Sequence, residues 1–135
     1  MGCYSHTKLP NLTKSCISHF PIYLIINTSC RKRGGHWISL FLKNKNEAYH
    51  FDSFGKGVKK ENIKYFLILN GYSSIMYNNV NIQDISSKTC GLFCIQFVKH
   101  VKSKTSYLKF LKLFDTSNLK KNDLIVKLML ELNKC

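Results

Sequence analysis

The chain has 135 residues, of which 44% are apolar and 13% aromatic, and its 21 Lys and Arg outnumber its 7 Asp and Glu, giving a net charge of +14. This apolar content is too high for a disordered tail and sufficient for one packed domain. No apolar run reaches the roughly 18 residues of a membrane-spanning helix, and the first residues lack the pattern of a secretory signal. We therefore expect one domain over residues 1–135 that is not secreted and has no membrane partner.

Residues 1–20 are polar, and we expect an irregular segment there. A core over residues 22–102 follows, and residues 103–135 should form further helices. Short β-prone runs separated by turn residues predict strands, whereas apolar residues at helical spacing predict helices. In chain order, we expect strands at Tyr23–Ile26, Trp37–Leu42, Ala48–Phe51 and Ile75–Val80, and helices at Lys59–Asn70, Cys90–Lys102, Tyr107–Phe114 and Asp123–Leu132.

These elements predict an α+β fold with a small, mainly antiparallel central sheet and a buried helix that carries Cys90. The helix from Cys90 is apolar nearly all round at its start, which is typical of a buried helix. A thiolate is favoured at a helix N-terminus, and the first amides there can also stabilise an oxyanion. Cys90 is therefore a candidate nucleophile, and Cys94, one turn further along, should be a buried apolar filler. For a cysteine taken alone, a packing role remains the competing interpretation.

His36 opens one predicted strand and Asp52 directly follows the next. If the two strands form a hairpin about Asn44–Asn46, His36 lies 9 residues before the turn centre at residue 45 and Asp52 lies 7 after it. The two side chains should then be close enough for a carboxylate to orient an imidazole, as in nucleophile triads. Gln83, in the loop before Cys90, is the candidate for a second oxyanion donor; Gln96 is a rival that lies further along the helix.

The six cysteines should be free thiols if the chain is not exported. One alternative concerns the first twenty residues, where Cys3, His6, Cys16 and His19 form two Cys/His pairs that could ligate a structural zinc ion. The spacing is unusual, and we expect no metal or other cofactor to be required for the chemistry.

The excess of basic residues predicts attraction to polyanions, with nucleic acid first. Because no recognition motif appears, any contact with DNA should be non-specific and directed at the backbone. The competing interpretation is that the lysines only keep the protein soluble or reflect genome composition.

Three strings in this order resemble the adenovirus-type cysteine protease: Gly-Gly-His-Trp at 34–37, Phe-Asp-Ser-Phe-Gly at 51–55 and Cys-Gly-Leu-Phe-Cys at 90–94. The resemblance spans about residues 22–102 and is closer still to proteases of virus-like DNA transposons and related DNA viruses. It implies that His36, Asp52, Gln83 and Cys90 follow the family's catalytic order. It also implies a fold shared distantly with ubiquitin-like peptidases. Residues 31–89 contain no cysteine, so we do not expect the covalent peptide activation known in the family.

The resemblance implies a cysteine endopeptidase that cleaves viral precursor proteins and is located in the virion, host nucleus or cytoplasm. It also implies DNA as a non-covalent activator. We expect a monomer. Two other functions remain open: a ubiquitin-like-protein-specific peptidase that acts on host conjugates, and an inactive basic DNA-binding module. Hydrolysis of a Gly-Gly-tailed substrate would favour the first, and failure of a thiol probe to label Cys90 would favour the second.

Overall fold

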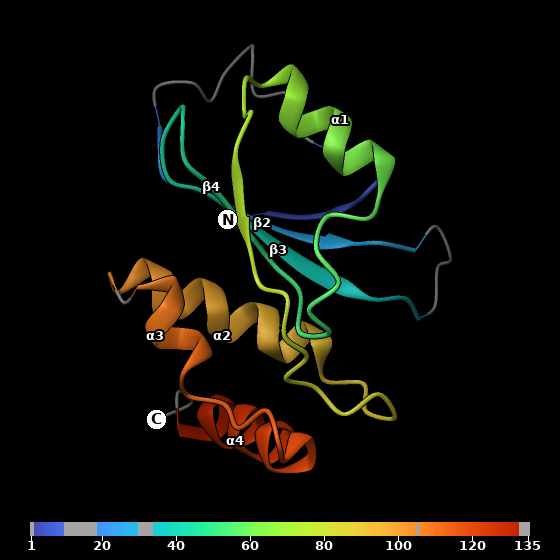
Figure 1. Ribbon diagram of the computed structural model, residues 1–135, viewed down its shortest axis with the longest axis vertical. Helices are drawn as coiled ribbons and strands as arrows, with labels where there is room; N and C mark the ends of the chain where they lie inside the picture. The colour runs from blue at the N-terminus through green and yellow to red at the C-terminus, as the bar shows by residue number, and fades with distance from the viewer. Residues whose placement is uncertain (1, 10–18, 30–33, 105, 133–135) are drawn as a thin grey trace.

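A computed structural model describes residues 2–9, 19–29, 34–104 and 106–132 (Figure 1). It confirms the α+β fold. The elements in chain order are β1 (Gly2–Ser5), β2 (Ile22–Asn27), β3 (Trp37–Leu42), β4 (Ala48–Phe51), α1 (Glu61–Leu69), β5 (Ile75–Tyr77), α2 (Cys90–Lys102), α3 (Tyr107–Leu111) and α4 (Leu119–Leu132).

The five strands form one mixed sheet in the order β1-β2-β3-β4-β5. The three central strands are antiparallel, as expected, whereas β1 pairs with β2 and β5 pairs with β4 in parallel. The expectation of an irregular segment over residues 1–20 was wrong at Gly2–Ser5, which forms the edge strand β1. Four residues without a clear alternation carry no strand signal of their own, and the pairing with β2 supplies the structure.

The β3–β4 hairpin forms as predicted. Leu42 pairs with Ala48 and Ser39 pairs with Phe51, so the strands meet around a turn at residues 43–47. The Asn44 side-chain oxygen accepts hydrogen bonds from the backbone N–H groups of Asn46 and Glu47, each at 2.8 Å. Such side-chain-to-backbone bonds are how Asn stabilises turns, and they fix the register that brings the far ends of the two strands together.

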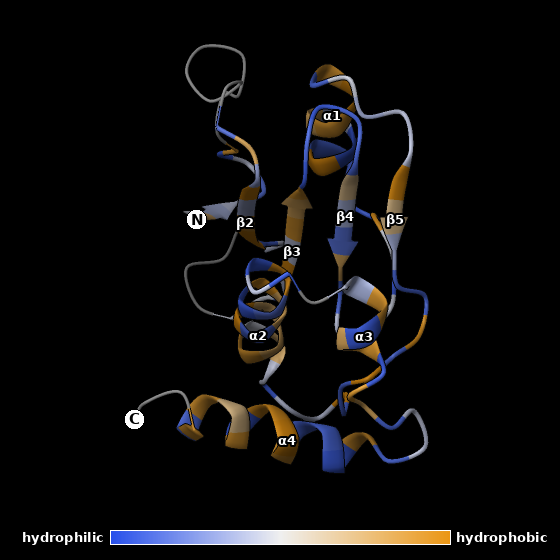
Figure 2. Ribbon diagram, turned by 90° about the vertical axis from the view of Figure 1, so that its left-hand side faces the viewer, coloured by the Kyte–Doolittle hydropathy of each residue, from blue (hydrophilic) through white to orange (hydrophobic). Residues whose placement is uncertain are grey.

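The sheet separates two apolar layers, and the alternation along β3 sets which residues enter each layer. Ile38, Leu40 and Leu42 belong to the cluster that includes α1, whereas Phe41 packs against the cluster that includes α2. Figure 1 shows α1 and α2 on opposite sides of the sheet. Helix α4 lies beyond α2, at the end of the molecule farthest from α1 (Figure 2).

Helix α2 is the centre of the larger layer and is buried along most of its length, as its sequence predicted. Phe97 is fully buried and stacks on Phe51 of β4, with 4.8 Å between ring centroids. It also meets Phe110 of α3 edge to face at 5.6 Å. Removing such a ring typically costs about 3–5 kcal/mol, so α2 is held rigidly against β3 and β4. Among the described helices, none is both long and apolar enough to cross a membrane.

Candidate active site

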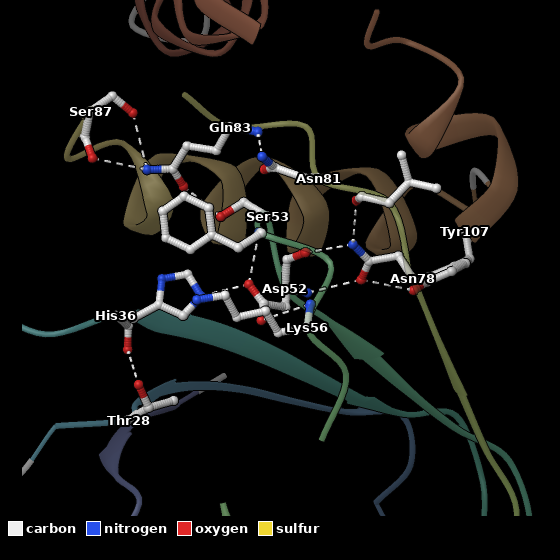
Figure 3. A network of polar contacts seen from close by, with 12 residues as sticks. Thr28, His36, Asp52, Ser53, Lys56, Asn78, Asn81, Gln83, Ser87 and Tyr107 are labelled. Atoms are coloured by element: carbon white, nitrogen blue, oxygen red, sulfur yellow. Dashed lines mark hydrogen bonds and ion pairs between the residues drawn. The ribbon is translucent and has the colours of Figure 1, made fainter. Parts of the chain in front are cut away.

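The hairpin brings His36 and Asp52 together, as predicted. His36 Nε2 lies 2.6 Å from Asp52 Oδ1 (Figure 3). Extending the β3–β4 register places Phe54 opposite His36, and the two rings stack with 4.7 Å between centroids. The imidazole is therefore held both by a carboxylate at one ring nitrogen and by an aromatic face.

Asp52 is only 3% exposed. Its carboxylate is held by backbone amides as well as by His36. Its Oδ1 accepts a hydrogen bond from Phe54 N at 2.8 Å, and its Oδ2 accepts one from Lys56 N at 3.3 Å. Burial alone would raise the pKa of Asp52, but the hydrogen bond and charge of His36 and the Phe54 amide lower it below its ordinary value. The carboxylate therefore stays ionised and fixes the His36 ring.

A buried amide holds the backbone of Asp52 in place. Asn78, which follows β5, accepts from Asp52 N at 2.9 Å and donates to Asp52 O at 2.5 Å. Tyr107 of α3 donates to Asn78 Oδ1 at 3.3 Å (Figure 3). It also donates to the His50 carbonyl at 2.9 Å. Sequence reasoning missed both residues because a polar side chain in a polar loop and a Tyr in a short helix give no signal of a long-range contact.

Cys90 is the first residue of α2 and is only 8% exposed. The last turn of the helix carries Lys99, His100 and Lys102, which suits the helix dipole, and its first turn holds no acid. Burial alone would raise the pKa of the Cys90 thiol, but the interaction with His36 and backbone groups of Trp37 and Gly91 lower it below its ordinary value. Cys94 is fully buried as predicted, and burial raises the pKa of its thiol.

The second ring nitrogen of His36, Nδ1, is the one available for proton exchange with Cys90. Burial opposes charge on the ring, but the hydrogen bond to Asp52 and the interaction with Cys90 raise the pKa of His36 to about 9. Nδ1 is buried and has no hydrogen-bond partner among the described residues. Because Asp52 occupies Nε2, Nδ1 is the atom left to exchange a proton with the thiol. The lowered thiol pKa and raised imidazole pKa together favour a thiolate–imidazolium pair at neutral pH.

Gln83 is fully buried in the loop before α2. Its Oε1 accepts a hydrogen bond from Ser53 Oγ at 2.5 Å, and its Nε2 donates to Ser87 O at 3.2 Å and to Ser87 Oγ at 3.0 Å. Ser53 O also accepts from Ile82 N at 2.9 Å. The structure thus joins the Gln83 loop to the end of β4, next to Asp52, and both N–H groups of the amide are directed at Ser87.

Helix α4 supplies a buried acid that sequence reasoning missed. Asp123 Oδ1 accepts hydrogen bonds from Thr89 at 2.7 Å and from Ser87 at 3.2 Å. Its neighbour Asn122 is fully buried and donates to Ile82 O at 3.0 Å. The loop that leads to Cys90 is therefore tied to α4 at both ends. An acid and an amide adjacent in a helix usually face solvent, so no pattern in the sequence pointed to this role.

The rival glutamine, Gln96, lies in the second turn of α2 and is 1% exposed, and its Nε2 makes no hydrogen bond with the described residues. The candidate zinc ligand Cys16 lies outside the described residues. The Asn62 side-chain amide donates a hydrogen bond to His6 Nδ1 at 3.3 Å. Within the described residues no group of three or more potential ligands is placed to hold a metal ion. Cys3, Cys90 and Cys94 are free thiols; the other three cysteines are outside the described part.

Comparison with known proteins assigns the family. The sequence model of the adenovirus endoprotease family matches residues 8–129, and the chain therefore belongs to that family. A protease of Bovine adenovirus C serotype 10 is 30% identical over 102 residues, which cover 59% of this chain and 52% of the relative. A protease of Bovine adenovirus 2 is 32% identical over 87 residues, covering 55% and 42%. The chain spans about half the length of the curated relatives it matches.

One solved structure supports the observed fold. The selenomethionine crystal structure of an ASFV protease superposes with a TM-score of 0.50 at 16% identity, over 75% of this chain and 41% of that chain. A second crystal structure of an ASFV protease gives a TM-score of 0.48 at 18% identity, over 65% and 35%. At this level of identity, the first of these likenesses supports the α+β fold and nothing about activity.

Proposed function

We propose that this chain is a cysteine endopeptidase in which Cys90 is the nucleophile, His36 the general base and Asp52 the residue that orients His36. The observation that carries the proposal is the 2.6 Å contact between His36 Nε2 and Asp52 Oδ1, which leaves Nδ1 for the thiol at the start of α2. A base held by a third group and placed to act on a nucleophile is the general arrangement for covalent catalysis.

The reaction would proceed in two steps. The Cys90 thiolate attacks the scissile carbonyl carbon, and as the tetrahedral intermediate collapses, the C–N bond breaks and His36 Nδ1–H donates its proton to the departing amine. A water molecule then attacks the thioester while Nδ1 takes its proton, and the C–S bond breaks to release the acid and restore the pair. Asp52 stays ionised throughout and holds the ring in the required tautomer.

In this proposal the oxyanion is stabilised by the Cys90 backbone amide and by Gln83. The helix N-terminus supports the first donor. Gln83 is in the correct loop, but its amide donates to Ser87. Its role therefore requires one of those hydrogen bonds to be exchanged for the substrate oxyanion, and catalytic hydrogen bonds often tighten only when substrate is bound.

We propose that the substrates are viral precursor proteins and that the peptidase acts on them in the virion or the host cell, because the relatives are proteases of adenoviruses. The alternative is a peptidase for ubiquitin-like conjugates. The test is whether purified wild-type protein hydrolyses a set of precursor-derived peptides or a Gly-Gly-tailed fluorogenic ubiquitin-like substrate, with Cys90→Ala as the control. Hydrolysis that persists in Cys90→Ala would refute the proposal. Wild-type preference for the ubiquitin-like substrate would favour the alternative.

DNA is a second proposed partner. The net charge of +14 is carried partly by exposed lysines on several elements, among them Lys99 and Lys102 of α2 and Lys120 and Lys121 of α4. Their spread suits non-specific backbone contact. Titrating unrelated labelled duplexes should show binding that weakens with salt at a log–log slope of about −0.9 per neutralised phosphate. Absence of binding at low salt, or binding that does not depend on salt, would show that the positive charge does not serve to bind the DNA backbone.

A further inference from the structure

A cavity of about 230 Å³ adjoins the His36–Asp52 pair on the side of the sheet that α1 covers. His36, Asp52 and Phe54 form one wall, and the segment that leads into α1 forms the other. A volume of this size suits one amino-acid side chain. Two residues of the candidate active site, His36 and Asp52, therefore line the cavity, whereas Cys90 does not.

The charged groups that line the cavity are mostly cations. Lys56, Lys59 and Lys60 are exposed at its rim, and no described carboxylate forms an ion pair with any of them. The lining acid, Asp52, has both oxygens engaged, with His36 and two backbone amides. Glu61, at the start of α1, does not line the cavity and pairs with Lys64 at 2.9 Å. The cavity thus has an uncompensated positive field.

Two polar features of the cavity wall also lack partners. His50 is 1% exposed and lines the cavity, and its Nδ1 makes no hydrogen bond with the described residues. A buried polar atom without a partner is costly and calls for a ligand. The N-terminus of α1 lies at the same wall, and its N-cap, Lys60, makes no side-chain cap hydrogen bond. A helix N-terminus attracts anions, so it adds to the field of the three lysines.

We propose that this cavity is a substrate subsite that accepts an Asp or Glu side chain of the cleaved polypeptide. The inference rests on the proposed peptidase function and specifies its substrate class. Lys56, Lys59 and Lys60 hold the carboxylate, and His50, which lines the cavity, adds a polar side chain to its wall. A peptide fits better than nucleic acid because the site is side-chain sized and shares a wall with His36 and Asp52. A DNA backbone would need a longer basic track.

The test uses peptide pairs that differ only in Glu or Gln at one position, scanned over four residues on each side of the cleaved bond. Wild-type protein should prefer Glu over Gln at one position by about tenfold in kcat/KM, a size expected for several partly screened ion pairs. Lys59→Gln/Lys60→Gln should reduce that ratio toward one. Lys109→Gln/Lys127→Gln removes two exposed lysines from α3 and α4 and should leave the ratio as in wild type.

Reversing the charge of Lys59 and Lys60 predicts a gained preference, which a simple loss of activity could not produce. Lys59→Glu/Lys60→Glu should make the same position prefer Lys over Glu. Equal cleavage of Glu and Gln peptides at every position by wild-type protein would overturn the subsite while leaving the peptidase intact. If the Lys59/Lys60 double variants weaken duplex DNA binding but keep the Glu preference, that result would also overturn the subsite and assign these lysines to DNA binding. Failure to cleave any peptide would refute the peptidase function itself.

Discussion

The β3–β4 hairpin and the loop that leads into α2 each supply part of the candidate active site, but different contacts hold them. His36 and Asp52 lie on neighbouring strands, and a short turn and a regular register bring them together. Gln83 is bound by Ser53, and Thr89, which directly precedes Cys90, is bound by Asp123 of α4, so both have partners far away in the chain. The comparison teaches that local strand pairing brings the proposed base and its orienting acid together, with Asn78 then holding the Asp52 backbone, whereas the loop before the proposed nucleophile is placed by tertiary contacts.

The largest effect on kcat should come from substituting Cys90 or His36, which lie one in each region. Cys90→Ala and His36→Ala should each lower kcat by several orders of magnitude, and the double variant should be little worse than either because the residues act as a unit. Steady-state hydrolysis of one peptide by the three variants measures this. Losses that multiply in the double variant would mean that the two residues act separately.

Within the hairpin, Asp52→Asn should lower kcat by roughly 10²–10⁴-fold, the range of general acid–base contributions, and by less than loss of Cys90. The carboxylate helps to raise the pKa of His36 to about 9. Removing its charge lowers that pKa, so the alkaline limb of the pH–rate profile should move to lower pH. Asp84→Asn changes an acid that bonds only within its own loop, to Ser86, and is the matched control. An unshifted alkaline limb in Asp52→Asn would contradict the role.

In the loop, Gln83→Ala should lower kcat by roughly 10²–10³-fold, the usual effect of removing one oxyanion donor. Alkylation of Cys90 should stay near the wild-type rate, because the thiol and His36 are unchanged. Gln96→Ala serves as the comparison. If Gln96→Ala were inactive and Gln83→Ala fully active, the choice of donor would be wrong.

A smaller effect should follow from cutting the tie to α4. Asp123→Ala leaves the hydroxyls of Ser87 and Thr89 without their acceptor, which should lower the free energy of unfolding by about 1–3 kcal/mol. It should also lower kcat several-fold with little change in KM, because the loop before Cys90 loosens. Asp123→Asn should restore much of both, since its amide oxygen can replace Oδ1. Denaturant unfolding and steady-state kinetics measure the two effects. An Asn variant as impaired as the Ala variant would contradict positioning through this acceptor.

The same contrast explains what the sequence could and could not predict. The fold class, the central strands and the His36–Asp52 pair follow from alternation and from counting residues about the Asn44–Asn46 turn, because pairing in a hairpin is local. The prediction of Cys90 as candidate nucleophile follows from its place at the start of an apolar helix. Asn78 and Asp123 could not be found in this way, since their partners lie 26 and 34 residues distant in the chain. The strand β1 was missed for the same reason.

The roles of the site residues remain predictions, and the ionisation of Cys90 tests them most directly. The rate of iodoacetamide alkylation at Cys90, followed by peptide mapping across pH, reports the thiolate in wild type and in His36→Ala. With His36 present, the half-point should lie below the ordinary thiol pKa. Without His36, burial still opposes the thiolate and only the backbone groups of Trp37 and Gly91 favour it, so the half-point should rise. A Cys90 that titrates at the same pH in both proteins would contradict the thiolate–imidazolium pair on which the proposed function depends.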